Sequence, residues 1–416
     1  MKKSNNKTML MVSFLGLMMA ASTSLVAGNL SSEEKLGKKL YFDTNLSEPN
    51  GQSCASCHTP SAGFAEPDSN LAVSEGVISG LFGGRNAPTA SYAMFVPKFG
   101  FNESEGLWTG GLFWDGRATG EKLNDPLAHQ ALGPFLNPVE MANPSKLTVV
   151  RDAKHSRYSD LYQNVCGNTN LSDEKDVDDA YNCIAEAIGN FERTSRFAQF
   201  TSKYDRYLQK CVSFTNKSDK ALDNCAQGVG IEAKFASYFT YTREEWKGLQ
   251  LFMGPNNNDG KMQWGEGANC ASCHSATWTN DSEYENNIAK PYWAPRGKVP
   301  PLFTDHTYDN LGVPANPHSV MANNGIDLGL GALKDGENGK FRVVGLRNIG
   351  ATAPYAHNGI FTNLKDIVHF YNSRDVDSSI AQAEVSENMN TDELGNLGLS
   401  DRQERQLVKF LNTLTD

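Results

Sequence analysis

Long hydrophobic runs are missing from this 416-residue sequence beyond its first 28 residues, and basic side chains are in deficit. A bilayer span needs about 20 consecutive apolar residues, so no membrane-spanning helix is expected after residue 28. The chain has 38 Lys and Arg against 48 Asp and Glu, which gives a net charge of −10. Because an acidic surface repels phosphate backbones, the composition argues against nucleic acid as a partner.

Strand-like alternation of apolar and polar residues is also scarce, which argues against a β-rich fold. Apolar residues instead recur at helical spacing in four segments, 31–43, 178–194, 242–254 and 400–416. Stretches rich in Gly, Pro and Asn lie between them. The sequence therefore predicts a mostly α-helical fold with long irregular loops.

The first 28 residues have the layout of a secretory signal peptide. Three lysines precede an apolar run, and the small residues Ala27 and Gly28 follow it. The alternative is an uncleaved membrane anchor, but the strongly apolar part, from Met9 to about Ala21, is short for a span. We therefore expect export and removal of residues 1–28, which would leave a net charge of −13.

The pentapeptide C-x-x-C-H occurs twice, more than two hundred residues apart. Its residues are Cys54, Cys57 and His58 in the first copy and Cys270, Cys273 and His274 in the second. This spacing is the attachment signal for c-type haem: two thioethers hold the porphyrin and the histidine binds iron. The alternatives are a redox-active cysteine pair, which normally lies in a βαβ context that neither copy has, or half of a zinc site. We predict two covalent c-type haems.

The four other cysteines carry no such signal. Cys166 and Cys183 are 17 residues apart, and Cys211 and Cys225 are 14 apart, without histidines at zinc-finger spacing. In an exported chain we expect two local disulfides, Cys166–Cys183 and Cys211–Cys225, although the spacing leaves other pairings open.

Several motifs, taken in order, resemble the bacterial diheme cytochrome c peroxidase family and its MauG-like branch. They run from about residue 31 to the C-terminus: "LGKKLYFD", the first "CASCH", "GRNAPT", "LFWDGRA", "HQALGPFLNPVEMA", the second "CASCH", "VVGLRNIGATAPYAHNGIF" and "LKDIVHFY". Each motif is weak alone, but the ordered series is specific. The resemblance implies a periplasmic enzyme of two cytochrome-c-like haem domains, an N-terminal peroxidatic domain at 29–190 and a C-terminal electron-transfer domain at 191–416.

The resemblance also assigns residues to the pocket of the first haem. Glu140, in "NPVEM", matches the acid/base glutamate of the family, with Gln130 and Pro134 in the same pocket. Cleavage of an O–O bond needs a group that takes a proton from one oxygen and returns it to the other, and a carboxylate can do this. Without the motif, a glutamate in a Pro/Asn loop would be read as a solvated turn residue or a helix cap.

Two further sites follow from the resemblance. Trp114, in "FWDGR", matches a tryptophan between the haems, although Trp108 lies near enough to confuse an alignment. The residues matching a calcium site between the haems are Asn86, Thr352 and Pro354. Amide and carbonyl oxygens are suitable ligands for calcium, but no acidic cluster marks this site in the sequence.

The iron ligands set this chain apart from ordinary diheme peroxidases. Those enzymes have a histidine before the "GRN" motif that caps the first haem, whereas no histidine lies between His58 and His129 here. They also have methionine as sixth ligand of the second haem, fourteen residues after the histidine of the "PYxH" motif. That histidine is His357 here, and Tyr371 stands fourteen residues later.

Tyrosine ligation is a MauG-like mark, because a phenolate favours oxidised iron. His369 is the alternative ligand of the second iron. Two residues apart on a helix means roughly 200° around its axis, so only one of the pair can face the iron, and we favour Tyr371. We interpret His357 as a structural residue or as one that supports a ligand from behind without touching iron. The remaining histidines are expected in loops or at the surface: His129, His155, His306 and His318.

Together these features predict an enzyme that reduces hydrogen peroxide at the first haem and draws electrons through the second. The donor would be a small cytochrome or cupredoxin, or aromatic side chains of a partner protein. The second option is favoured by Tyr371 and by the missing capping histidine. It is weakened because the surface tryptophan of the MauG-like enzyme, two residues before the second pentapeptide, is absent, and Trp264 is out of register. The alternative function is a diheme electron carrier without catalysis.

Overall fold

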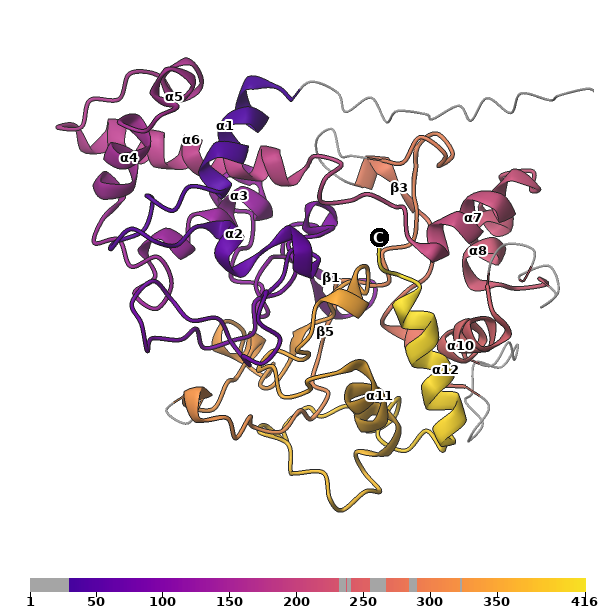
Figure 1. Cartoon of the computed structure of the whole chain (residues 1–416). Helices are drawn as coiled ribbons and strands as arrows, with labels where there is room; N and C mark the ends of the chain where they lie inside the picture. The colour runs from indigo at the N-terminus through magenta and orange to yellow at the C-terminus, as the bar shows by residue number, and fades with distance from the viewer. Residues whose placement is uncertain (1–29, 232–236, 238–240, 255–266, 284–289, 322–323) are drawn as a thin grey trace, which may run out of the picture.

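The computed structural model describes residues 30–231, 237, 241–254, 267–283, 290–321 and 324–416 (Figure 1). The expected signal peptide, residues 1–28, and Trp264 lie outside the described residues. Within the described ranges, no helix combines the length and the apolar character of a membrane span.

Helices dominate the described chain, as the sequence predicts. The α-helices are α1 (Ser32–Tyr41), α2 (Cys54–Cys57), α3 (Pro126–Ala131), α4 (Lys146–Lys154), α5 (Ser159–Cys166), α6 (Glu174–Glu192), α7 (Lys203–Ser213), α8 (Asp219–Gln227), α10 (Arg243–Met253), α11 (Leu364–Ser373) and α12 (Asp401–Asn412). The four segments with helical spacing correspond to α1, α6, α10 and α12.

Strands among the described residues are short and form three antiparallel pairs. These are β1 (Gly100–Asn102) with β2 (Leu107–Thr109), β3 (Thr279–Asn280) with β4 (Lys298–Val299), and β5 (Tyr308–Asp309) with β6 (Phe341–Arg342). The mostly helical class with long irregular connections is therefore confirmed.

The helices that precede the two pentapeptides begin in the same way. At the start of α1, Ser31 accepts a hydrogen bond from the backbone of Glu34, whose side chain accepts one from the backbone of Ser31. Thr242 and Glu245 repeat this capping box at α10. The reciprocal bonds satisfy backbone donors that a helix start leaves unpaired, so both helix starts are defined by local sequence.

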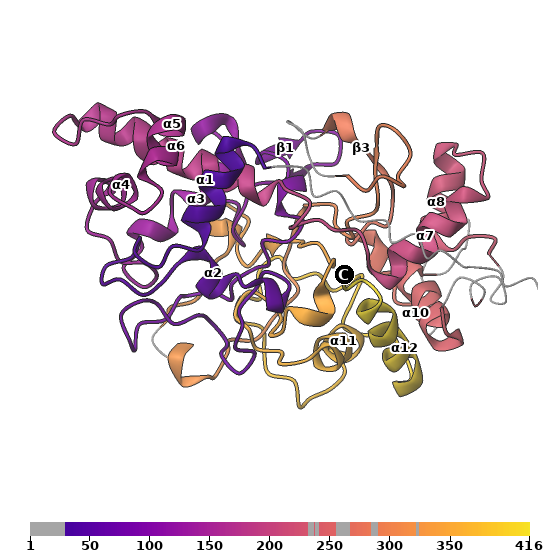
Figure 2. The same cartoon turned by 45° about the horizontal axis from the view of Figure 1, so that its top comes forward.

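Each of these helices crosses a second helix at close range. The Cα of Gly37 in α1 faces α6 so closely that an added Cβ would lie 1.8 Å from the carbonyl oxygen of Ala187. At Gly248 in α10, an added Cβ would lie 2.0 Å from the carbonyl oxygen of Gln406 in α12. The α1–α6 and α10–α12 pairs lie side by side in both views (Figures 1 and 2). The chain therefore repeats one arrangement, in which a glycine lets two backbones meet ahead of a C-x-x-C-H turn.

Buried side chains form two large clusters in the described chain. One extends over residues 36–200 and includes Val299 and Leu302, and the other extends over residues 204–414. Each cluster contains one of the two crossed helix pairs. The division into domains at residue 190 remains a prediction.

Both expected disulfides are present. Cys166 of α5 is bonded to Cys183 of α6, and Cys211 of α7 is bonded to Cys225 of α8. Each bond joins helices that are neighbours in the chain. The four cysteines of the pentapeptides take part in no disulfide, so the eight cysteines fall into the two groups that the sequence predicts.

Candidate active site

Both pentapeptides fold into a short helical turn, α-helical in the first copy and 3-10 in the second, that is closed by the same backbone hydrogen bond. The backbone N–H of His58 donates to the carbonyl of Cys54 at 2.9 Å, and that of His274 donates to the carbonyl of Cys270 at 2.9 Å. The turn places two cysteine side chains and the imidazole that follows them around one cavity in each half of the chain. Two thiols and one imidazole are the protein groups that a covalent c-type haem requires.

The two imidazoles are oriented alike by backbone oxygens. Nδ1 of His58 lies 3.3 Å from the carbonyl oxygen of Phe64, and Nδ1 of His274 lies 3.0 Å from that of Phe303. A hydrogen bond from Nδ1–H fixes the tautomer in which Nε2 carries the lone pair. Both rings are therefore arranged to offer Nε2 to iron.

The first cavity, of about 650 Å³, brings the predicted catalytic residues to the first pentapeptide. It is lined by Cys54, Cys57, His58, Gln130, Pro134 and Glu140, among others. Asp125 accepts a hydrogen bond from the backbone of Leu127 and begins α3, which carries Gln130, and Glu140 lies in the loop beyond. All three pocket residues inferred from the resemblance thus border the cavity of His58.

Glu140 is held by one hydrogen bond inside this cavity. Asn137 Nδ2 donates to Oε1 of Glu140 at 2.7 Å. Burial raises the pKa of the Glu140 carboxyl, while the Arg117 guanidinium and the Asn137 amide act in the opposite direction. A carboxyl with a raised pKa exchanges protons closer to neutral pH than an exposed one does.

A buried carboxyl in the first cavity, that of Glu192, was not predicted from the sequence. Glu192, the last residue of α6, is 6% exposed and lines the cavity. Burial raises its pKa to about 8; Arg193 opposes this shift and Asp125 adds to it. A sequence signal existed: Glu192 lies four residues after the buried Ile188 and so falls on the apolar face of α6.

Glu192 is expected to make stability depend on pH. Its pKa is raised from 4.5 in the unfolded chain to about 8 in the folded protein. The folded state therefore binds more protons between these values, and stability falls as pH rises, by up to about 1.4 kcal/mol per pH unit from this group. Glu192→Gln removes this contribution. The difference in melting temperature, variant minus parent protein, should therefore increase from pH 5 to pH 8. A constant difference across this range would contradict the assignment.

The second cavity contains Cys270, Cys273 and His274 together with Tyr371 of α11. His369, two residues earlier on α11, does not line this cavity. Its side chain is 47% exposed, and its Nδ1 lies 2.9 Å from a carboxylate oxygen of Glu404. The two rings therefore point to different sides of α11, as the helical angle between them requires.

Trp114 lies where the two cavities meet. It lines both, and its indole N–H donates to the backbone oxygen of Asn86 at 2.9 Å. Trp108 lines neither cavity and stacks on Phe99 with ring centroids 5.0 Å apart. His357 also borders both cavities, 4% exposed and stacked on Phe341 at 3.6 Å.

The residues matched to a calcium site surround the second cavity. Asn86 is 5% exposed and lines both cavities, and Thr352 and Pro354 line the second. The Asn86 Nδ2 donates to the carbonyl of Ala72 at 3.2 Å, which orients its amide oxygen away from that contact. A calcium site at these three residues remains a prediction.

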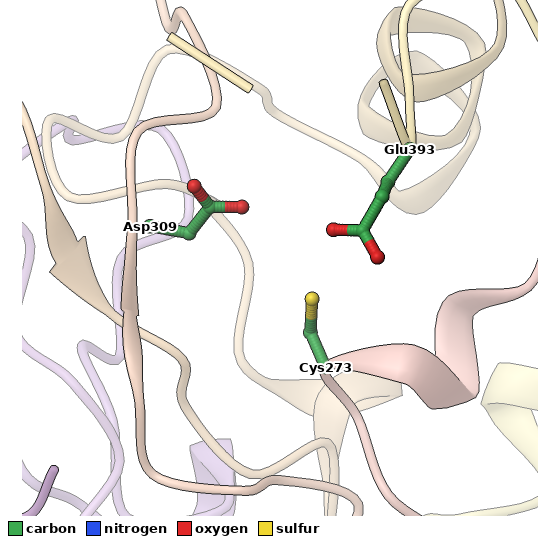
Figure 3. Close-up of side chains that lie close together, drawn as sticks. All are labelled: Cys273, Asp309 and Glu393. Atoms are coloured by element: carbon green, nitrogen blue, oxygen red, sulfur yellow. The ribbon is translucent and has the colours of Figure 1, made fainter. Parts of the chain in front are cut away.

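Two carboxylates approach the second pentapeptide. Asp309 and Glu393 point toward Cys273, with the three potential ligand atoms within 4.8 Å of one another (Figure 3). Asn390 Nδ2 donates to both carboxylates, at 2.7 Å and 2.9 Å. If the Cys273 sulfur forms a thioether to haem, only the two carboxylates remain as potential metal ligands. Asp309 and Glu393 then add negative charge beside the second cavity.

His306 lies in a loop, as predicted, and in addition lines the second cavity. Its Nδ1 is buried, with no hydrogen-bond partner among the described residues. Burial lowers its pKa to about 3. The residue adopts a positive φ of 61°, which the sequence does not signal. The His306 ring reaches the cavity through the conformation of the loop that leads into β5.

Comparisons with known proteins agree with this geometry. A family model described as di-haem cytochrome c peroxidase matches residues 31–213. The methylamine utilization protein MauG of Paracoccus denitrificans (strain Pd 1222) is 32% identical, over 92% of this chain and 88% of the relative. The cytochrome c551 peroxidase of Nitrosomonas europaea is 27% identical, over 92% of this chain and 79% of the relative.

The fold is similar to a solved diheme enzyme. The crystal structure of the diheme peroxidase BthA from Burkholderia thailandensis E264 aligns with 94% of this chain and 87% of its own, with a TM-score of 0.68 and 28% identity. The likeness extends over both cavities, as does the match to MauG. The chain therefore belongs to the MauG and di-haem cytochrome c peroxidase family, and is a diheme oxidoreductase with two c-type haems.

Proposed function

We propose that this protein is a MauG-like enzyme that cleaves hydrogen peroxide at an open first haem and draws electrons through a second haem bound by His274 and Tyr371. One observation carries the proposal: the two pentapeptides face different surroundings. The cavity of His58 contains the carboxyl of Glu140, whereas the cavity of His274 contains the phenol of Tyr371.

In the first cavity, the side chains bind peroxide and move its proton. A haem there supplies an iron that accepts peroxide and exchanges electrons. Glu140 takes the proton from the near peroxide oxygen and returns it to the leaving oxygen. Its Oε1 is occupied by Asn137 Nδ2, so Oε2 is the atom that carries the proton. Gln130 and Pro134 complete the wall and orient the bound peroxide.

In the second cavity, Tyr371 would supply a phenolate oxygen to the iron that His274 binds. Burial raises the pKa of the free Tyr371 hydroxyl, and ferric iron offsets this because a bound cation favours the deprotonated ligand. An anionic ligand stabilises oxidised iron relative to reduced iron. Trp114, which borders both cavities, connects the two sites for electron transfer.

The remaining features of the proposal concern the setting of the enzyme. Export by the leader at 1–28 places it in the periplasm, where domains 29–190 and 191–416 carry one haem each. A calcium ion at Asn86, Thr352 and Pro354 lies near the junction of the cavities. Electrons come from a small cytochrome or cupredoxin, or from aromatic side chains of a protein substrate.

The fully ferric enzyme is expected to react with hydrogen peroxide without prior reduction. Apart from His58, the only imidazole lining the first cavity in the described chain belongs to His357, which is stacked on Phe341. Electron paramagnetic resonance of the isolated ferric protein should show a high-spin signal that shifts when peroxide is added. Two low-spin signals without a response would instead identify a diheme electron carrier. Reaction only after one-electron reduction would show that a residue such as His357 caps the first iron.

A further inference from the structure

Arg342 is a buried cation without an anionic partner. It lies on β6, is 7% exposed and lines both cavities. Among the described residues, its one side-chain hydrogen bond is from Nε to the backbone oxygen of Phe113 at 3.4 Å. Within the described chain, no carboxylate is at ion-pair distance from its guanidinium.

Other arginines of low exposure in the described chain are paired with carboxylates. Arg347, 1% exposed, donates from Nη1 to both carboxylate oxygens of Asp205, at 2.8 Å and 2.7 Å. Arg85 forms ion pairs with Asp115 and Asp327, each at 2.7 Å. Two carboxylates that border the cavities are already engaged: Asp327 with Arg85, and Glu384 with the backbone of Asp327. A buried charge without a counter-charge is energetically costly. We therefore expect an anion beside Arg342 that the described chain does not supply.

We infer that the Arg342 guanidinium binds a propionate of one of the two haems where the cavities meet. A c-type haem carries two carboxylates on the edge opposite its thioether bonds. The planar guanidinium matches a carboxylate through paired N–H···O bonds. Because Arg342 borders both cavities, it would be placed to neutralise a propionate at the side where the two cavities meet. This inference rests on the haem placement of the proposed function.

The inference predicts a shift in reduction potential. Arg342→Met retains much of the side-chain volume but removes a positive charge near the haem. The oxidised state of the nearby haem gains relative stability, and its ferric/ferrous equilibrium should move toward ferric iron by roughly tenfold, or about 59 mV for one electron. The thioether bonds retain both haems in the variant. Arg342→Lys, which restores a cation, should recover most of the shift.

Spectroelectrochemical titration of wild type, Arg342→Met, Arg342→Lys and Arg151→Met tests this. Arg151 is a half-exposed arginine of α4, and its replacement controls for the loss of a solvent-screened charge. A fall in one haem potential in Arg342→Met alone supports the inference and identifies the haem. Unchanged potentials, or a shift that Arg342→Lys does not recover, would overturn it. Fewer than two covalent haems per wild-type chain, measured as pyridine haemochrome, would contradict the proposed function itself.

Discussion

Replacing Glu140 with glutamine is expected to slow peroxide cleavage by roughly 10²- to 10⁴-fold while both haems stay attached. The amide keeps the size of the side chain but cannot take the proton from peroxide, and loss of an acid/base group has effects of this size. Stopped-flow absorption with the ferric enzyme measures the rate of the first reaction with peroxide. Glu121→Gln, at an exposed carboxylate before α3, is the matched control and should react at the wild-type rate.

The pH profile gives an independent signature of the same role. The reaction needs the Glu140 carboxylate, so activity falls as pH drops through its pKa. Because burial raises that pKa above 4.5, the acid limb of kcat/KM for peroxide should lie above pH 4.5. Glu140→Gln should lose this limb. An unchanged rate in Glu140→Gln would remove the residue from the mechanism, and a retained limb would assign the titration to another group such as Glu192.

Features that depend on a few consecutive residues were predictable from the sequence. The turn of each pentapeptide is closed by a bond from His58 to Cys54 or from His274 to Cys270, four residues apart. The capping boxes at α1 and α10 also lie within four residues. The separation of Tyr371 from His369 follows from helix geometry alone. In these cases local sequence determines the structure before tertiary packing contributes.

Features that depend on packing between distant segments were missed. Arg342 stands on a two-residue strand, and its burial arises because β6 pairs with β5 and its backbone N–H donates to the carbonyl of Trp114. A strand of two residues is too short to show an alternation of buried and exposed positions. The sequence therefore does not indicate that Arg342 is buried or that it lacks a carboxylate partner. Glu192 is a milder case, because helical periodicity places it on the buried face of α6 even though glutamate is usually exposed.

The choice between Trp114 and Trp108 shows the same distinction. Both tryptophans are six residues apart in one motif-rich stretch, and the sequence alone offers only the resemblance to separate them. In the structure Trp114 borders both cavities, while Trp108 packs on Phe99 and on the Lys334 ammonium, 4.3 Å from its ring. Three-dimensional position therefore supports the tryptophan that the motif favours.

Replacing Tyr371 with histidine is expected to change the second haem and leave the first one open. A neutral imidazole opposite His274 stabilises oxidised iron less than a phenolate does. The potential of the second haem should rise by roughly a hundred millivolts or more, within the range of about 0.8 V that axial ligands cover. The second haem should stay six-coordinate and low-spin. Spectroelectrochemistry and electron paramagnetic resonance measure both properties in the same sample.

The same substitution should abolish storage of an oxidising equivalent at the second haem after peroxide is added. The first cavity keeps Glu140, Gln130 and Pro134, so peroxide is still cleaved, but the second equivalent then resides on a protein or porphyrin radical near the first haem. Freeze-quench electron paramagnetic resonance distinguishes this radical from the wild-type product.

His369→Gln is the matched control for Tyr371→His, because both residues lie on α11 but only the Tyr371 side chain lines the second cavity. His369 is half-exposed and paired with Glu404, so its loss should cost about 1 kcal/mol or less of stability and leave both potentials unchanged. The opposite result, a changed second haem in His369→Gln and an unchanged one in Tyr371→His, would make His369 the ligand. The two C-x-x-C-H turns would then no longer differ through a phenolate, and the protein would be placed with peroxidases whose second haem has a neutral sixth ligand.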